Sequence, residues 1–265
     1  MKIKLIAIDM DDTLLNSELA ISERTFAAVT AAQAKGVAVA IATGRMFSSA
    51  LPYAKQLAMQ VPIITYNGAL IRHPQTDATL FHQTIEDEAA TKVRQLFKER
   101  GWYLQAYVND QLYVKERGRE AKSYEALAGI RSIALGDDFF AQAQAPTKML
   151  AMAEPELLAE IEATVNAALG GRIFTATSKP TYLELMHPDV NKGRALAMLG
   201  EHLGVERDEI MAIGDSNNDY AMLEYAGLGV AMGNASERVK KVAQFVTDGN
   251  DADGVAQAIE QFILA

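Results

Sequence analysis

Cysteine is absent from the chain of 265 residues. This absence excludes disulfide bonds, thiolate metal ligands and a cysteine nucleophile. The chain also has no uninterrupted run of 18 apolar residues, the length that a membrane-spanning helix requires. Its first acidic residue, Asp9, comes too early for a secretory signal peptide, because the apolar segment of such a peptide is longer. We therefore expect a soluble, cytoplasmic protein with no membrane partner.

Several binding motifs are also missing. Neither GxxxxGK[ST] nor GxGxxG occurs, so nothing favours a nucleotide cofactor. The four histidines are scattered without the spacing of metal ligands. The net charge is −9, and acidic and basic residues are interspersed along the chain. This balance argues against a nucleic-acid partner, whereas a small phosphorylated substrate needs only one local cluster of cations.

The first third of the chain alternates apolar segments with amphipathic ones. Near-continuous apolar runs, typical of strands buried on both faces, lie at 2–9, 37–44 and 61–68. Segments with a helical pattern lie between them, at 21–36 and 46–59. Ser22 is placed to cap the first of these helices, and Gly36 follows its end. This order predicts a parallel, doubly wound sheet with right-handed connections.

From about residue 84 the pattern changes to helices mixed with hairpins. The turn pair Asn109-Asp110 separates two segments rich in aromatic and β-branched residues, which predicts a β-hairpin. A helix at 154–171 has Pro155 near its start, and further strands are predicted at 172–178 and 181–187. Such a mixture predicts an α+β unit that is separate from the parallel sheet.

After Pro188 the alternation of helix and strand resumes. We therefore predict an α/β protein with two domains. Residues 1–83 and 187–265 form a Rossmann-like core around a doubly wound parallel sheet, and residues 84–186 form an inserted α+β domain.

Four polar clusters stand at predicted strand ends or helix starts. They are Asp9 with Asp11, Thr43-Gly44-Arg45, Lys192, and GDSNND at 214–219. Each one alone has a simpler interpretation, because acids and glycines often form turns and caps and a lysine at a helix start is usually solvated. In an open α/β sheet, however, ligands bind beyond the carboxyl ends of the strands. The occurrence of all four clusters at such positions favours one shared site.

The residue types in these clusters suit a phosphoryl group and a metal ion. Asp9, Asp11 and Asp215 have no basic neighbours in sequence, so three such carboxylates are stable together only around a cation, and hard oxygen ligands suit Mg²⁺. Thr43 offers a hydroxyl, Gly44 a backbone N–H and Lys192 a positive charge to phosphoryl oxygens.

The sequence resembles a known family in these motifs. DMDDT at 9–13, ATGR at 42–45, a lysine before a helix and GDSNND occur in the order found in the haloacid dehalogenase superfamily of phosphotransferases. The closer resemblance is to its Cof-type, sugar-phosphatase-like branch. The segment 84–186 lies between the second and third motifs, where that branch carries a large α/β cap of the C2 type.

The resemblance implies roles for the acidic residues. Asp9 would be the nucleophile that forms an aspartyl phosphate, and Asp11 would be the general acid and base. Mg²⁺ would be held by Asp9, by the Asp11 position through its backbone carbonyl, and by Asp215. Asp12 falls where many members of the family have glycine, so we expect it to be a turn residue.

The resemblance also implies the groups around the phosphate. Thr43, Gly44, Lys192 and Asn218 would bind phosphoryl oxygens, and Asp219 would support Lys192 or a metal-bound water.

We therefore predict a Mg²⁺-dependent phosphatase of small phosphorylated metabolites, with sugar phosphates as the favoured class, in a monomer or small homo-oligomer. Two alternatives stay open. One is a phosphosugar mutase or phosphotransferase, and the other is a regulatory module that binds a phosphorylated ligand without turnover.

Overall fold

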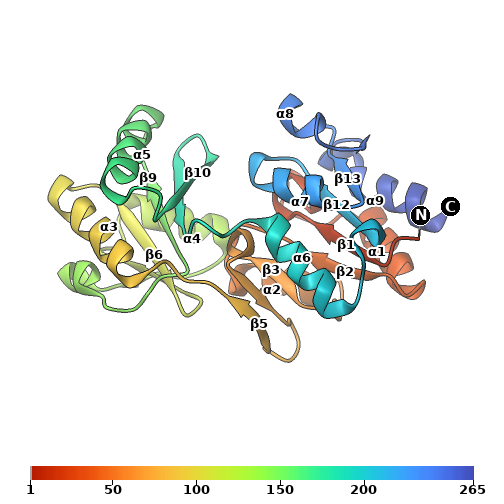
Figure 1. Cartoon of the computed structure of the whole chain (residues 1–265), viewed down its shortest axis with the longest axis horizontal. Coiled ribbons are helices and arrows are strands. Elements are labelled where there is room, and N and C mark those ends of the chain that lie inside the picture. Colours follow the sequence, from red (N-terminus) through yellow and green to blue (C-terminus); the bar gives the residue numbers. More distant parts are fainter. Residues whose placement is uncertain (1) are drawn as a thin grey trace. The chain divides into compact units, whose positions relative to one another are not determined.

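The computed structural model describes residues 2–265, which divide into two compact units. The core unit comprises the described residues up to Gly44 together with Ala50–Phe81 and Asn191–Ala265. The inserted unit comprises Arg45–Ser49 and His82–Val190. Figure 1 shows both units in the colours of the sequence.

A five-stranded parallel sheet forms the centre of the core unit, with strand order β14-β13-β12-β1-β2. Its strands are β1 (Leu5–Ile8), β2 (Ala38–Ile41), β12 (Ile210–Gly214), β13 (Leu228–Ala231) and β14 (Phe245–Val246). The chain begins at β1, proceeds outward on one side to β2, and returns on the other side to β12. This order confirms the predicted doubly wound sheet and places its switch point at β1.

Helices flank this sheet, and the first two lie within the segments predicted at 21–36 and 46–59. The helices are α1 (Glu23–Ala34), α2 (Phe47–Gln56), α6 (Lys192–Leu203), α7 (Tyr220–Tyr225), α8 (Glu237–Lys240) and α9 (Gly254–Ile259). The Ser22 hydroxyl accepts a hydrogen bond from the backbone N–H of Thr25, which confirms the predicted cap of α1. The Asn191 side chain caps α6 in the same way by accepting from the backbone N–H of Arg194. This cap makes Lys192 the first residue of α6.

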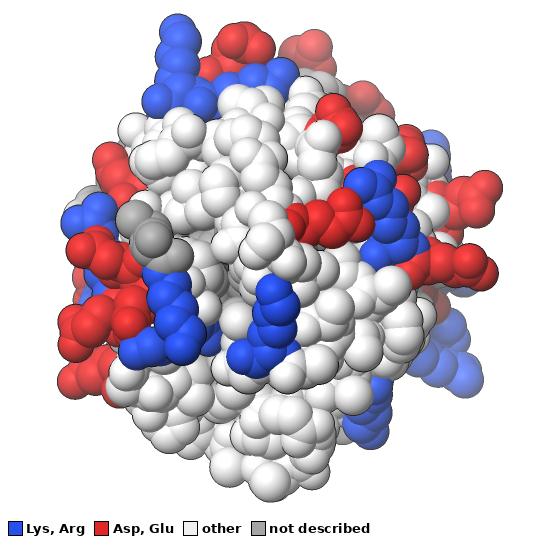
Figure 2. Space-filling model, turned by 90° about the vertical axis from the view of Figure 1, so that its right-hand side faces the viewer, with Lys and Arg blue, Asp and Glu red and all other residues white. Residues whose placement is uncertain are grey.

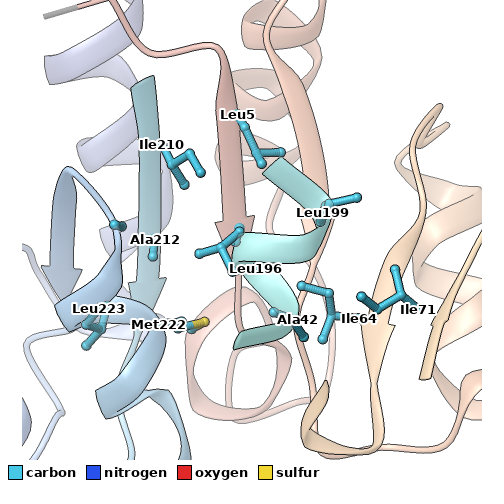
Figure 3. Close-up of a cluster of buried hydrophobic side chains, with 14 of the residues drawn as sticks. Leu5, Ala42, Ile64, Ile71, Leu196, Leu199, Ile210, Ala212, Met222 and Leu223 are labelled. Carbon is cyan, nitrogen blue, oxygen red and sulfur yellow. The ribbon is translucent and has the colours of Figure 1, made fainter. Parts of the chain in front are cut away.

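Apolar side chains from α6 and α7 cover one face of the sheet. Leu196 and Leu199 of α6 pack in one cluster with Leu5, Ile210 and Ala212 of the central strands (Figure 3). Because side chains alternate along a strand, the intervening residues of β1, Ile6 and Ile8, point to the opposite face, where they are also fully buried. The central strands are therefore covered on both faces and held in a fixed position.

A small three-stranded sheet, in which β3 and β4 pair in antiparallel, extends the core unit beyond β2. A single parallel bridge between Ala42 and Ile64 joins the end of β2 to the next strand. The three strands of this second sheet are β3 (Ile63–Thr65), β4 (Leu70–Arg72) and β5 (Thr79–His82). The strand predicted at 61–68 therefore ends early, because residues 66–68 form a turn with positive φ angles.

The inserted unit is built on a six-stranded sheet with strand order β10-β11-β9-β6-β7-β8. The strands are β6 (Leu104–Val108), β7 (Gln111–Val114), β8 (Ile133–Ala134), β9 (Lys148–Met152), β10 (Phe174–Lys179) and β11 (Tyr182–Met186), and the helices are α3 (Asp87–Arg100), α4 (Arg119–Ala128) and α5 (Pro155–Leu169). Asn109 and Asp110 have φ angles of 51° and 58° between β6 and β7, as a two-residue hairpin turn requires. The predicted hairpin is therefore confirmed.

The inserted unit has a hydrophobic core of its own. Phe97 of α3 and Ile161 of α5 pack in one cluster with Met149 and Leu183 of the sheet. All residues of this cluster come from the continuous stretch 85–185. The hydrophobic cluster of the inserted unit is therefore built from its own residues.

Charged side chains of both signs are dispersed over the surface. On the face shown in Figure 2, acidic and basic residues are interspersed with uncharged ones. None of the helices in the described part of the chain combines the length and the apolar character needed to span a bilayer.

Candidate functional site

The predicted site lies at the carboxyl ends of two neighbouring strands. Asp9 follows β1, and Asp215 follows β12. These strands pair in parallel with Ile8 opposite Ile213, and the backbone N–H of Asp9 continues the ladder by donating to the Ile213 carbonyl at 2.9 Å. The register thus brings two carboxylates together that are far apart in the sequence, at the switch point where α/β proteins bind ligands.

After Asp9 the chain makes a tight turn over Met10–Leu14. The turn closes when the N–H of Leu14 donates to the Asp9 carbonyl at 3.1 Å. Asp12 has a φ angle of 59° in this turn, the left-handed conformation that glycine adopts most easily. Its side chain is exposed. The structure therefore agrees with the expectation that Asp12 is a turn residue.

Lys192 joins two of the acidic side chains. Its Nζ donates to Asp9 Oδ1 at 2.5 Å and to Asp219 Oδ1 at 2.6 Å. The side chains of Lys192 and Asp219 are fully buried, and that of Asp9 is only 6% exposed. One carboxylate oxygen of each of Asp9, Asp215 and Asp219 lies within 4.8 Å of the others. We call these three acids and Lys192 the charged cluster.

Burial shifts the acid–base behaviour of this charged cluster. It raises the pKa of Asp9 well above the ordinary value, and the neighbouring carboxylates of Asp219 and Asp215 raise it further, whereas Lys192 lowers it. Burial also raises the pKa of Asp215 to about 7, with a further contribution from Asp219. Lys192 behaves oppositely, because burial lowers its pKa but the attraction of Asp219 and Asp9 is stronger and leaves it raised.

Asp219 is held by the backbone of the β12 end. Its Oδ2 accepts the N–H groups of Asp215 at 3.1 Å and Ser216 at 3.0 Å, while its Oδ1 accepts from Lys192. A Cβ atom at Gly214 would lie 2.6 Å from the Asp219 Cβ, so only glycine allows this close approach. Both oxygens of Asp219 are therefore engaged within the protein, as a supporting residue for Lys192 would be.

A second group of side chains links the end of β2 to the loop after β12. The Asn67 backbone N–H donates to the Thr43 carbonyl at 3.0 Å. The Asn67 Oδ1 accepts from Asn218 Nδ2 at 3.0 Å, and it lies 2.9 Å from where a Gly44 Cβ would be. Asn218 in turn accepts from the Ser216 hydroxyl at 2.7 Å. We call Thr43, Gly44, Asn67 and Asn218 the amide group.

The residues predicted for the site thus fall into two neighbouring sets. Asp9, Asp215, Asp219 and Lys192 meet in the charged cluster, whereas Thr43, Gly44 and Asn218 meet in the amide group. Asp11 lies two residues after Asp9, in the turn over Met10–Leu14, and is half-buried. Among the described residues, it does not belong to the group of acids whose carboxylate oxygens lie within 4.8 Å of one another.

Sequence reasoning missed two residues of this site. Thr13 belongs to the DMDDT motif but was given no role, and its hydroxyl donates to Asp215 Oδ1 at 2.8 Å. Asn67 was also missed, although an Asn-Gly pair directly after an apolar strand signals a special turn. That signal indicates a turn and does not reveal which distant residues the asparagine contacts.

The charged cluster fits a divalent cation. Three carboxylates face one ammonium group, so full ionisation leaves an excess of negative charge in a buried space. The neighbouring carboxylates also contribute to the raised pKa values of Asp9 and Asp215. A hard divalent cation prefers carboxylate oxygens and would offset this repulsion.

A doubly wound α/β core with an inserted unit, and with acids and a lysine at its switch point, defines a class of phosphoryl-transfer hydrolases. The family model of haloacid dehalogenase-like hydrolases matches residues 6–259, so the chain belongs to this family. The resemblance found in the motifs is confirmed.

Curated relatives and solved structures agree with this membership. A 5-amino-6-(5-phospho-D-ribitylamino)uracil phosphatase of Bacillus subtilis (strain 168) is 34% identical, over 99% of this chain and 96% of its own. The phosphatase YwpJ of the same organism is 30% identical, over 98% of this chain and 100% of its own. A haloacid dehalogenase-like hydrolase from Bacteroides thetaiotaomicron superposes with a TM-score of 0.92 at 32% identity, over 99% of this chain and 100% of its own. The protein is accordingly a phosphatase, a hydrolase of phosphoric monoesters.

Proposed function

We propose that this phosphatase is Mg²⁺-dependent and hydrolyses small phosphorylated metabolites, with sugar and polyol phosphates as its substrate class. The observation that carries the proposal is the charged cluster, in which Lys192 lies within hydrogen-bond distance of Asp9 beside the buried Asp219 and the half-buried Asp215. The substrate class is supported by the relative at 34% identity, whose name describes a phosphorylated ribityl compound.

The proposed reaction has two steps, and both use Asp9 and Asp11. In the first, an Asp9 carboxylate oxygen attacks phosphorus, and the bond between phosphorus and the substrate oxygen breaks. Asp11 gives its proton to the leaving oxygen, so the substrate departs as an alcohol and Asp9 carries the phosphoryl group. In the second step Asp11 takes a proton from water, the water oxygen attacks phosphorus, and inorganic phosphate leaves Asp9 free.

The remaining residues serve the phosphoryl group. Lys192, Thr43, Gly44 and Asn218 bind its oxygens, and Asp219 holds Lys192 in place through the contact at 2.6 Å. Asp9, Asp215 and the backbone carbonyl of Asp11 would hold Mg²⁺, which would supply positive charge to offset the negative charge of the phosphoryl group.

A panel of phosphorylated metabolites tests the proposal when phosphate release is measured with and without EDTA. We expect the wild-type protein to release phosphate from sugar and polyol phosphates only in the presence of Mg²⁺. Asp9→Asn should abolish release, because an amide cannot attack phosphorus. Asp12→Asn is the matched control, since it removes the same charge three residues away on an exposed side chain and should retain most of the activity.

Unchanged turnover in Asp9→Asn would overturn the mechanism.

The same panel separates the two alternatives. A mutase would convert one sugar phosphate isomer into another without releasing phosphate, and a regulatory module would bind a phosphorylated ligand without either product.

A further inference from the structure

The turn after β3 holds two consecutive non-glycine residues in the left-handed conformation. Tyr66 has a φ angle of 52° and Asn67 one of 56°, and both residues are buried. Asparagine tolerates this region, but an aromatic residue adopts it at a cost of about 1 kcal/mol or more. A conformation of this kind persists where the surrounding contacts hold it, and it is found most often at functional sites.

The next residue shows what holds the turn. Gly68 has a φ angle of 105°, and a Cβ atom there would lie 2.5 Å from the Asn191 carbonyl oxygen. The turn therefore packs directly against the residue that caps α6, one position before Lys192. Its position is fixed by the same helix start that presents the lysine.

Asn67 uses this fixed position to contact both parts of the amide group. Its backbone N–H donates to the Thr43 carbonyl at 3.0 Å, and its side-chain oxygen lies against Gly44. The same oxygen accepts from Asn218 Nδ2 at 3.0 Å. One residue thus connects the loop after β2 with the loop after β12.

The contact with Asn67 also determines the orientation of the Asn218 carboxamide. An amide oxygen such as Asn67 Oδ1 can only accept hydrogen bonds, so it faces the NH₂ group of Asn218 and not its oxygen. The Asn218 oxygen is occupied by the Ser216 hydroxyl. An NH₂ group has two hydrogens, so one remains for an acceptor such as a phosphoryl oxygen.

We propose that Asn67 is a positioning residue for phosphate binding, which aims the donor end of Asn218 and the Thr43-Gly44 backbone at a phosphoryl group. This inference rests on the proposed function, since it assigns a purpose to the amide group. Asn67 acts through its neighbours, so its loss should weaken the binding of phosphate without changing the chemical groups that react.

Steady-state hydrolysis of p-nitrophenyl phosphate, with inorganic phosphate as a competitive inhibitor, tests this role in the full-length protein. Asn67→Gly removes the carboxamide and keeps a residue that accepts the left-handed conformation. We expect KM and the inhibition constant of phosphate to rise about tenfold, as for the loss of a hydrogen bond to a charged group. The matched control is Asn109→Gly, the same change at a φ angle of 51° in the hairpin turn of the inserted unit, which should leave both constants unchanged.

A double-variant comparison tests whether Asn67 acts through Asn218. Asn67→Gly combined with Asn218→Ala should raise the phosphate inhibition constant by less than the product of the two single effects, because the two residues share one interaction. Provided that the wild-type enzyme is active, two results would overturn the inference. One is an unchanged inhibition constant of phosphate in Asn67→Gly, and the other is a double-variant effect equal to the product of the two single effects. An inactive wild-type enzyme would overturn the proposed function and the inference together.

Discussion

Lys192 stays positively charged although its side chain is fully buried, because its ammonium group is paired with two carboxylates. Its side chain is 0% exposed, and its Nζ lies 2.5 Å from Asp9 and 2.6 Å from Asp219. Removing one partner of a buried ion pair costs far more than removing a surface pair, because the remaining charges are left uncompensated. The lysine therefore contributes to folding as well as to the proposed binding of phosphate.

Lys192→Met measures this contribution. In EDTA at neutral pH we expect the variant to lose about 3 kcal/mol of unfolding free energy, which urea titration would measure. Burial and the neighbouring acids already raise the pKa of Asp9, and loss of the ammonium raises it further, so the folded variant takes up protons more readily than the unfolded chain does. The deficit should therefore shrink as the pH falls from about 8 to about 5.

Lys4→Met is the control, since Lys4 pairs with Glu209 at 2.6 Å on the surface with 47% of its side chain exposed. It should cost less than about 1 kcal/mol at every pH in that range. A pH-independent deficit in Lys192→Met would contradict the account of the charged cluster.

At the scale of elements, the boundaries that depend on local signals could be predicted from the sequence. The cap at Ser22 and the turn pair Asn109-Asp110 depend on neighbouring residues only, and both are present in the structure. Helix α4 and strand β8 were not predicted, since neither segment has a strong pattern of its own. The left-handed conformation of Tyr66 was also unpredictable, because it opposes the preference of the residue and belongs to a turn whose Gly68 packs against Asn191, far away in the sequence.

The packing of α6 on α7 is the element-scale feature that positions the lysine. Gly193 lies in the first turn of α6, where a Cβ atom would be 2.4 Å from the Ala221 carbonyl oxygen. Alanine has a higher helix propensity than glycine by about 1 kcal/mol. At this position, however, the added methyl group would push α6 away from α7 and displace the neighbouring Lys192.

We therefore expect Gly193→Ala to destabilise the protein by about 2 kcal/mol and to lower kcat/KM at least about tenfold. Gly200→Ala in the same helix is the matched control, because its Cβ would meet the end of the Ile210 side chain at 3.0 Å and the Val205 carbonyl oxygen at 3.2 Å, both less close than the 2.4 Å at Gly193. That variant should stay within about 1 kcal/mol of the wild type with unchanged kcat/KM. Equal effects of the two substitutions in urea unfolding and steady-state kinetics would show that the α6–α7 contact does not position Lys192.

At the scale of the whole molecule, the core unit is assembled from both ends of the chain. Strand β1 pairs with β2 on one side and with β12 on the other. Most of the inserted unit lies between β2 and β12 in the sequence. The strand ends that carry Asp9 and Asp215 could be predicted because apolar runs mark both strands. The approach of Asn67 to Asn218 could not, since it depends on how the β3 turn, the β2 end and the β12 loop pack together.

This organisation predicts two separate units of stability, which hydrogen–deuterium exchange can resolve. Leu196→Ala removes a buried side chain from the core cluster (Figure 3), and it should lower the free energy of opening by about 3 kcal/mol. Amide exchange should then accelerate in β1 and in β12 alike, although the inserted unit lies between them in the sequence, because the two strands are paired. Leu183→Ala removes a fully buried leucine from the separate core of the inserted unit and should accelerate exchange in β9 and β11 instead. If either substitution accelerated exchange equally in both units, the two cores would be a single cooperative structure, and the division of stability inferred from their separate hydrophobic clusters would be wrong.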